Sequence, residues 1–315
     1  MKVPTIVSVL KETATDWSRD NATRLAAALA FYTVLSLAPL LMLAVSIAGL
    51  VFGEEAARGQ IASQLTAVTG PEAGEGIQTV LANADAPKTG TLSSILSIAV
   101  LLFGASGVFG ELQSSLNEVW QVQRKPGKLL SVLRQRFFSF SMVLGVAFLL
   151  LVSLLVSAVL TAVGDKLTHA LPGGEVLWQG VNLVASLGII TVIFALIFKV
   201  IPDVQIAWSD VWVGAFATAV LFTVGKFGLD MYLGRASVAS PYGAAGSLIV
   251  LVIWVYYAAQ ILFFGAEFTQ VHARRRGAEL KPKKHAEAKQ LERVVHEHGE
   301  RKVVDISPPR TATAH

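Results

Sequence analysis

The chain has 315 residues, of which 53% are hydrophobic and only 15% are charged, and its formal net charge is +4. A soluble domain carries about a quarter charged residues, so this composition excludes an ordinary water-soluble globular protein. The sequence contains no cysteine, which excludes structural disulfides and thiol chemistry.

Six apolar stretches, each about as long as a membrane-spanning helix, make up most of the chain. A spanning helix needs roughly 20 mostly apolar residues because the hydrocarbon core is about 30 Å thick. The sequence therefore predicts an all-α, polytopic membrane protein with six transmembrane helices. The predicted spans are Leu29–Phe52, Leu92–Phe109, Phe137–Val163, Val181–Ile201, Val211–Leu233 and Ala244–Phe268.

The stretches outside the spans divide the chain into three parts. Residues 1–28 are predicted to form a cytoplasmic interfacial helix, because apolar residues recur at helical spacing from Ile6 to Trp17. Residues 29–270 form the six-helix membrane domain, with an outer loop at 53–91. Residues 271–315 are expected to be a basic, largely disordered cytoplasmic tail.

Several local features refine this division. Two apolar stripes separated by Gly70-Pro71 predict a pair of short helices in the outer loop, as a packing cap or a gate. The second span continues as a helical stripe to Trp120, and small residues after Gly104 predict a bend into an elbow along the cytoplasmic surface. A short helix is expected over Ala286–Val295, and the Ser307-Pro308-Pro309 end is expected to be disordered. Pro39 predicts a kink in the first span, with Ser36 or Thr33 satisfying the freed backbone locally.

The distribution of Lys and Arg predicts the orientation in the membrane. Sixteen of them lie on the side that holds both ends of the chain and only four lie on the other side. Because cytoplasmic loops carry the excess of positive charge, both termini are predicted to be cytoplasmic. The basic tail then meets the anionic lipids of the cytoplasmic leaflet, and we expect no nucleic-acid partner.

Lys226 and Asp230 are the charges nearest the membrane interior. Intramembrane ionisable groups often mark a substrate path. The alternative is structural anchoring, because a lysine this close to the outer surface can snorkel and pair with Asp230 at i+4. The next span adds polar groups at Tyr256, Tyr257 and Gln260, and together these five residues form the candidate substrate path.

No constellation of catalytic or metal-ligating residues is recognisable. The sequence has no Walker loop, nucleophile elbow or dinucleotide fingerprint, and His296-Glu297-His298 lacks the spacing of a zinc site. We expect no catalytic residue, no metal and no cofactor, and hence no enzyme. Glu267, two turns before Arg274–Arg276, predicts an interfacial salt bridge.

Four segments resemble the YihY/BrkB family of bacterial inner-membrane proteins: Ala26–Pro39, Gly104–Trp120, Ile201–Val204 and Ser240–Glu267. The resemblance covers roughly Asp16 to Arg276. It implies a six-helix protein of the bacterial inner membrane with cytoplasmic termini, in a family associated with virulence and with envelope lipid or lipopolysaccharide handling. The motif residues that match are Pro39, Gly107, Asp203, Tyr242, Gly243, Gly246, Trp254 and Glu267.

Three functions remain in view at this point. The first is a transporter or flippase-like protein for an envelope lipid or a small solute. The second is a non-transporting membrane scaffold or envelope-integrity factor. The third, well behind, is the tRNA-processing ribonuclease implied by a "ribonuclease BN" label that family members carry. The Gly49–Gly53 spacing is typical of helix dimers, so either a homo-oligomer or packing within one bundle fits it.

Overall fold

The computed structural model describes residues 6–83, 91–125, 174–236, 245–278, 280–283, 285–288, 292–297 and 300–305. The predicted third span, Phe137–Val163, lies outside these residues, as do Tyr242 and Gly243. Within the described part, four helices are long and apolar enough to cross a bilayer: Ala22–Leu50, Gly180–Val200, Trp208–Leu233 and Gly246–Arg275. They correspond to predicted spans one, four, five and six. The total of six spans and the orientation stay predictions.

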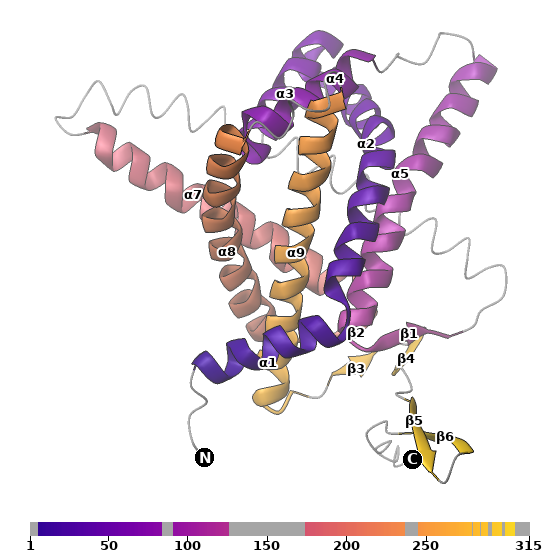
Figure 1. Cartoon of the computed structure of the whole chain (residues 1–315). Coiled ribbons are helices and arrows are strands. Elements are labelled where there is room, and N and C mark those ends of the chain that lie inside the picture. Colours follow the sequence, from indigo (N-terminus) through magenta and orange to yellow (C-terminus); the bar gives the residue numbers. More distant parts are fainter. Residues whose placement is uncertain are drawn as a thin grey trace.

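Among the described residues, five long helices form the body of the molecule, with α9 at its centre (Figure 1). Helix α9 packs against α2 on one side and α8 on the other, α5 packs against α2, and α7 slants behind α8. Large apolar side chains of α8 such as Phe216, Val224 and Phe227 are more than half exposed, as expected for a surface that faces lipid acyl chains. The bounds are α2 Ala22–Phe52, α5 Thr91–Val119, α7 Gly174–Val200, α8 Trp208–Ala236 and α9 Gly246–Arg275.

The two predicted helices of the outer loop are confirmed as α3 (Glu54–Thr69) and α4 (Pro71–Asn83). They cover one end of the bundle, which we call the cap end (Figure 1). Their apolar stripes are buried: Ile61 and Ile77 join Leu251 of α9 in one hydrophobic core. Helices α3 and α4 are therefore packed against the bundle, and we call them the cap.

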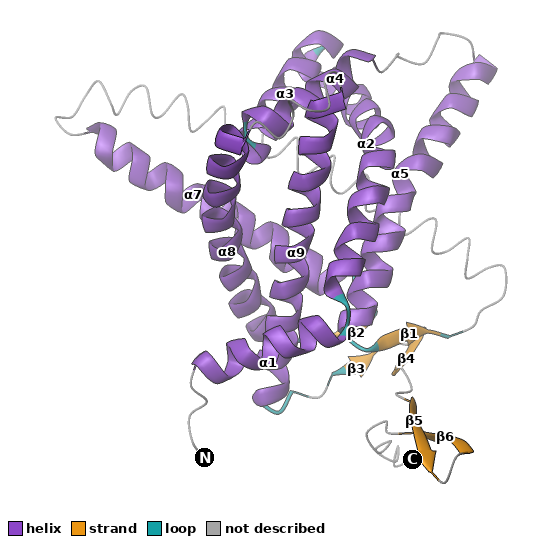
Figure 2. Ribbon diagram, viewed as in Figure 1, coloured by secondary structure: helices purple, strands orange, loops and turns teal. Residues whose placement is uncertain are grey.

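The opposite end carries the first helix and the short strands, and we call it the strand end (Figure 2). A helix, α1 (Ile6–Arg19), is present where the interfacial helix is predicted, and its position on the membrane interface stays a prediction. Strand β1 (Val122–Arg124) pairs with β4 (Ala286–Ala288), and β2 (Val204–Gln205) pairs with β3 (Lys281–Pro282), both antiparallel. The first part of the tail is thereby attached to segments that precede it by 76 residues or more. Strands β5 (Glu292–Glu297) and β6 (Glu300–Asp305) form a separate hairpin.

Three local predictions are wrong. The expected helix over Ala286–Val295 is instead β4 and the start of β5, because this backbone finds its hydrogen-bond partners in other strands. The expected elbow after Gly104 is absent from α5, which is a single helix that continues along α2 (Figure 1). Neither Ser36 nor Thr33 donates to the carbonyl of Leu35, which Pro39 frees. The Ser36 hydroxyl donates to the carbonyl of Gly104 on α5 at 2.7 Å, and the Thr33 hydroxyl donates to the carbonyl of Leu29 in its own helix at 2.7 Å.

Glycine residues set the close approach of α8 and α9. A Cβ at Gly214 would lie 1.8 Å from Oγ1 of Thr269, and a Cβ at Gly265 would lie 1.9 Å from Oγ1 of Thr218. Each threonine hydroxyl donates to the carbonyl four residues earlier, which is the glycine of its own helix. Such contacts between small residues replace the hydrophobic effect as the source of helix association in lipid.

Candidate functional site

The predicted pair of charges in α8 forms an ion pair beneath the cap. The ammonium of Lys226 lies 3.1 Å from Oδ2 of Asp230, and each side chain is about one quarter exposed. The turn between α3 and α4 lies directly on this pair, since a Cβ at Gly70 would be 2.6 Å from Oδ1 of Asp230. Gly70 has φ +84°, a conformation that glycine adopts without steric cost. The cap therefore fixes the position of the Asp230 carboxylate.

Helix α9 brings part of the remaining candidate path to the same place. The Tyr257 hydroxyl lies against Gly225, the residue before Lys226, where a Cβ would be 2.7 Å from it. Gln260 follows one turn further along α9, and its buried Oε1 has no partner among the described residues. Tyr256 packs instead against the core at the strand end. The structure thus groups Lys226, Asp230 and Tyr257, and it directs Tyr256 elsewhere.

A second polar cluster surrounds Asp203 at the strand end. Asp203 is 2% exposed and lies just before β2. Its Oδ2 accepts from Nε of Arg124 at 2.8 Å and from Nδ2 of Asn117 at 2.9 Å, and its Oδ1 lies 2.8 Å from Nε2 of His285. Gln113 donates to the same Oδ1 at 3.2 Å. One carboxylate therefore joins α5, β1, the α7–α8 connection and the tail.

The charges around Asp203 favour its ionised form. Burial alone raises the pKa of a carboxyl group, but hydrogen bonds from Arg124, His285 and Asn117 and the charge of Arg124 hold the pKa of Asp203 below its ordinary value. The Lys283 backbone N–H donates to the Asp203 carbonyl at 2.9 Å. Burial, together with the charges of Lys199 and Arg124, lowers the pKa of Lys283 despite the nearby Asp203. These features describe a structural joint between the tail and the bundle.

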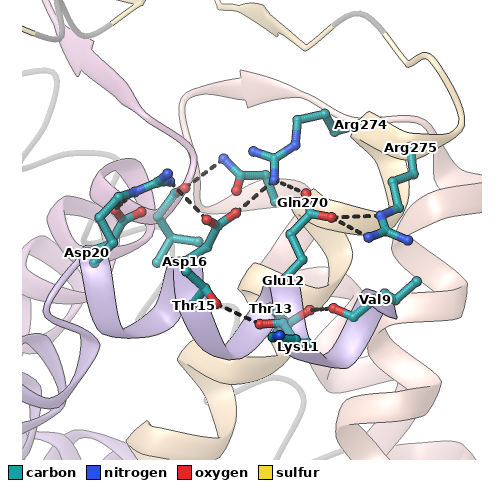
Figure 3. Close-up of polar contacts among 12 residues, drawn as sticks. Val9, Lys11, Glu12, Thr13, Thr15, Asp16, Asp20, Gln270, Arg274 and Arg275 are labelled. Atoms are coloured by element: carbon teal, nitrogen blue, oxygen red, sulfur yellow. Dashed lines mark hydrogen bonds and ion pairs between the residues drawn. The ribbon is translucent and has the colours of Figure 1, made fainter. Parts of the chain in front are cut away.

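Ion pairs attach α1 to the end of α9 (Figure 3). Arg274 contacts Oε1 of Glu12 at 2.6 Å and Oδ2 of Asp16 at 2.7 Å, and Nε of Arg275 donates to Oε2 of Glu12 at 2.7 Å. Although burial opposes it, hydrogen bonding to Arg274 and Arg275 lowers the pKa of Glu12. The salt bridge predicted between Glu267 and this arginine cluster is wrong, because the carboxylates of α1 lie closer to Arg274 and Arg275.

The other motif residues lie at helix contacts. Pro39 faces α5, where a Cβ at Gly104 would be 2.9 Å from its Cγ, and Gly107 packs on Ser36 and Tyr32 of α2. Trp254 makes an edge-on ring contact with Phe222 at 6.1 Å. Gly246 is buried at the start of α9, and Glu267 is buried near its end. Among the described residues, no group of three or more His, Cys, Asp or Glu side chains is placed to hold a metal ion.

Both the geometry and the comparisons with known proteins define a helical membrane protein. Residues 13–290 match the family described as virulence factor BrkB, and the chain belongs to this family. It is 25% identical over 250 residues to a UPF0761 membrane protein of Nitrosospira multiformis, covering 79% of this chain and 57% of the relative. A UPF0761 membrane protein of Vibrio parahaemolyticus is 28% identical over 275 residues, covering 85% of this chain and 82% of the relative.

The relatives differ in how much of their length this chain matches. The chain covers 58% of a UPF0761 membrane protein of Verminephrobacter eiseniae, at 29% identity and with 79% of this chain aligned. It therefore spans a little over half the length of this relative and of the Nitrosospira one. No solved structure matches the chain.

Proposed function

We propose that this protein is a multi-span transporter or flippase-like protein for an envelope lipid or a small solute. The observation that carries the proposal is the Lys226–Asp230 pair, which lies in a span and is about one quarter exposed. Charged side chains within a bilayer cost several kcal/mol and commonly mark substrate pathways. Tyr257 and Gln260 on the adjacent helix supply further polar atoms.

The surroundings of the pair favour a lipid over a solute. Val224 and Phe227, which flank Lys226 in the sequence, are 64% and 65% exposed, and Met231 beside Asp230 is 57% exposed. An acyl chain would lie along these apolar side chains while a phosphate-containing headgroup meets the ammonium of Lys226. The ion pair with Asp230 would keep Lys226 oriented until the headgroup replaces the carboxylate.

The distribution of basic residues supports a location in the bacterial inner membrane with both termini in the cytoplasm. In this orientation the strand end faces the cytoplasm, and its basic residues contact the anionic leaflet. The cap end and the Lys226–Asp230 pair then lie near the outer surface. A lipid taken at this level would exchange with the outer leaflet.

A reconstitution experiment tests the proposal. Purified protein in vesicles is assayed for movement of fluorescent phospholipid between leaflets, with Lys226→Ala and Asp230→Asn as variants. Lys11→Ala, which removes an exposed lysine of α1, is the matched control. We expect lipid movement by the wild type and by K11A, and at least about a tenfold loss in K226A, the effect of losing one charged contact worth roughly 1.4 kcal/mol. Equal rates for wild type, K226A and protein-free vesicles would reject transport of phospholipid.

A scaffold is the second candidate, and the attachment of the tail to the bundle favours it. Strands β3 and β4 and the Asp203 cluster hold tail residues 281–283 and 285–288 in a defined position, as a surface for partners requires. If the protein is a scaffold, removal of residues 281–315 abolishes its cellular role while K226A has no effect. If the protein is a transporter, K226A should impair the cellular role more than removal of residues 281–315.

A further inference from the structure

Glu267 is a fully buried carboxyl group that forms no ion pair with the described residues. It lies in α9 with 0% exposure, and neither carboxyl oxygen has a hydrogen-bond partner among the described residues when it is treated as ionised. A buried ionised carboxylate without partners is very costly, and such groups bind a proton or a cation instead. The arrangement around Glu267 indicates which of these it binds.

The turn that follows α1 places a second carboxyl group, that of Asp20, against Glu267. The side chains of Glu267 and Asp20 lie within hydrogen-bond reach of each other. Oδ2 of Asp20 is also buried and has no other partner in the described part of the chain. Two carboxylates in contact repel each other strongly, whereas one proton between them gives an O–H group that donates to the second carboxylate. The two carboxyl groups are therefore stable in contact when together they bind one proton.

The charges that face this pair come from three helices. Helix α1 contributes Asp16 and Arg19, α5 contributes Glu118, and α9 contributes Arg274. Both cations are engaged at the edge of the site: Arg19 lies 3.3 Å from Asp16 and from Asp20, and Arg274 lies 2.7 Å from Asp16. Burial and the charges of Asp16 and Glu118 raise the pKa of Asp20 despite Arg19. The net environment of the pair is acidic.

Gln270 is a further buried polar side chain, one turn further along α9. It is 3% exposed, and its Nε2 donates to the carbonyl of Val119 at 2.8 Å. Its Oε1 is buried and has no donor among the described residues. Figure 3 shows Gln270 beside Arg274, among the polar side chains between α1 and α9. Within the described part of the chain, buried acceptors on α9 and in the turn after α1 thus have no donor, which is compatible with a bound proton but not with a bound anion.

We propose that Asp20 and Glu267 bind one exchangeable proton between α1 and α9, and that this proton is the coupling ion of transport. In the bound state Glu267 carries the proton, and its O–H group donates a hydrogen bond to Oδ2 of Asp20. In the released state the proton passes to water and both groups are ionised, which is favourable only after α1 separates from α9. The coupling role rests on the proposed function, whereas proton binding does not.

Infrared difference spectroscopy of the full-length protein in nanodiscs tests proton binding directly. The wild type is expected to keep the carbonyl band of a protonated carboxyl group at neutral pH, where ordinary carboxyl groups are ionised. Glu267→Gln should remove the band. Asp20→Asn should lower its titration midpoint by about one pH unit or more, because an amide replaces a like charge. Glu75→Gln, which removes an exposed carboxyl group of α4, is the matched control and should leave the band unchanged.

Several results would overturn the proton site. One is the absence of a protonated carboxyl band in the wild type at neutral pH, and another is the same band in wild type, E267Q and D20N. A spectrum that responds to sodium ions at constant pH but not to pH would assign the site to a metal cation. Should E267Q fail to fold, D20N alone decides, since an unchanged midpoint there contradicts a shared proton.

Lipid movement in vesicles with an imposed pH gradient separates the two proposals. We expect the gradient to change the wild-type rate several-fold and to have no effect on E267Q. If the band behaves as expected but wild-type protein moves no lipid, proton binding stands and the transport function fails. If wild-type protein moves lipid at a rate that is independent of the gradient, transport stands and the coupling role fails.

Discussion

Gly265 of α9 lies against Thr218 of α8, so close that a Cβ at position 265 would be 1.9 Å from the threonine Oγ1. The contact is repeated in reverse between Gly214 and Thr269. In each helix the threonine follows its glycine by four residues, and the two helices run antiparallel, so each glycine faces the threonine of the other helix. This reciprocal arrangement fixes the register of α8 on α9 and hence the position of Lys226 relative to Tyr257.

Substitution of Gly265 by alanine is therefore expected to destabilise the bundle. The added methyl group displaces Thr218, and overpacking of this kind costs typically 1–3 kcal/mol. The apparent melting temperature in detergent should fall, and Thr218→Ala added to G265A should restore part of it. Gly228→Ala is the matched control, because nothing lies within 4 Å of a Cβ there; it should be neutral or slightly stabilising. Equal losses in G265A and G228A would show that helix contact is not responsible.

The turn at Gly70 gives a second prediction, which reports on the candidate path. Gly53 and Gly70 have similar φ values, +85° and +84°, but only Gly70 faces a neighbour, the Asp230 carboxylate. Replacement by alanine strains either backbone by about 1–3 kcal/mol. Gly70→Ala should lose more stability than Gly53→Ala, because the carboxylate must also move. It should also weaken lipid movement, whereas G53A should not.

The sequence predicts the helices well because their signals are local. Apolar length identifies α2, α7, α8 and α9, and helical spacing of apolar residues identifies α1, α3 and α4. The polar contacts between helices carry no such signal. Arg124 and Asp203 are 79 residues apart and Asp20 and Glu267 are much further apart, so only the packed structure brings them together.

Two misinterpretations have the same origin. The spacing along α9 predicts that Glu267 pairs with the arginines two turns further along, but in the structure Arg274 contacts the carboxylates of Glu12 and Asp16 on α1 instead. The tail residues Ala286–Ala288 were predicted to be helical, but β1 supplies a partner strand more than 160 residues earlier in the chain. In both cases tertiary contacts override a preference inferred from nearby residues.

The Asp203 cluster predicts a pH dependence of stability. The pKa of Asp203 in the folded protein lies below its ordinary value of 3.8, so ionisation stabilises the fold. By linkage this stabilisation is complete at neutral pH and is lost as the pH falls below about 4 toward the lowered pKa. Asp203→Asn should lower the free energy of unfolding by about 2 kcal/mol at neutral pH, less than the roughly 3–5 kcal/mol for breaking a fully buried ion pair, because Arg124 is partly exposed.

Melting temperatures measured across acidic pH check this prediction. The wild type should lose stability more steeply than D203N below pH about 4, so that the two curves converge. Lys125→Gln is the control, because this exposed residue neighbours Arg124 but takes part in the cluster only through its backbone N–H. Parallel curves for the wild type and D203N would show that Asp203 is not the titrating group.

The last prediction concerns the ion pairs that attach α1 to α9. Arg274→Gln should destabilise this contact more than Arg275→Gln, although the Arg274 side chain is the more exposed of the two, at 43% against 26%. The reason lies in their partners: Asp16 is 6% exposed and would lose its 2.7 Å contact, whereas Glu12 is 31% exposed and becomes hydrated. We expect R274Q to lower the free energy of unfolding by about 1–2 kcal/mol, because it leaves a buried charge partly unsatisfied. R275Q should lower it by less than about 1 kcal/mol. Apparent melting temperatures and the rate of proteolytic cleavage near Arg19 measure both effects. A larger loss in R275Q would contradict the importance of Asp16, and an Asp16→Asn/R274Q double variant that is strictly additive would show that the two side chains do not interact.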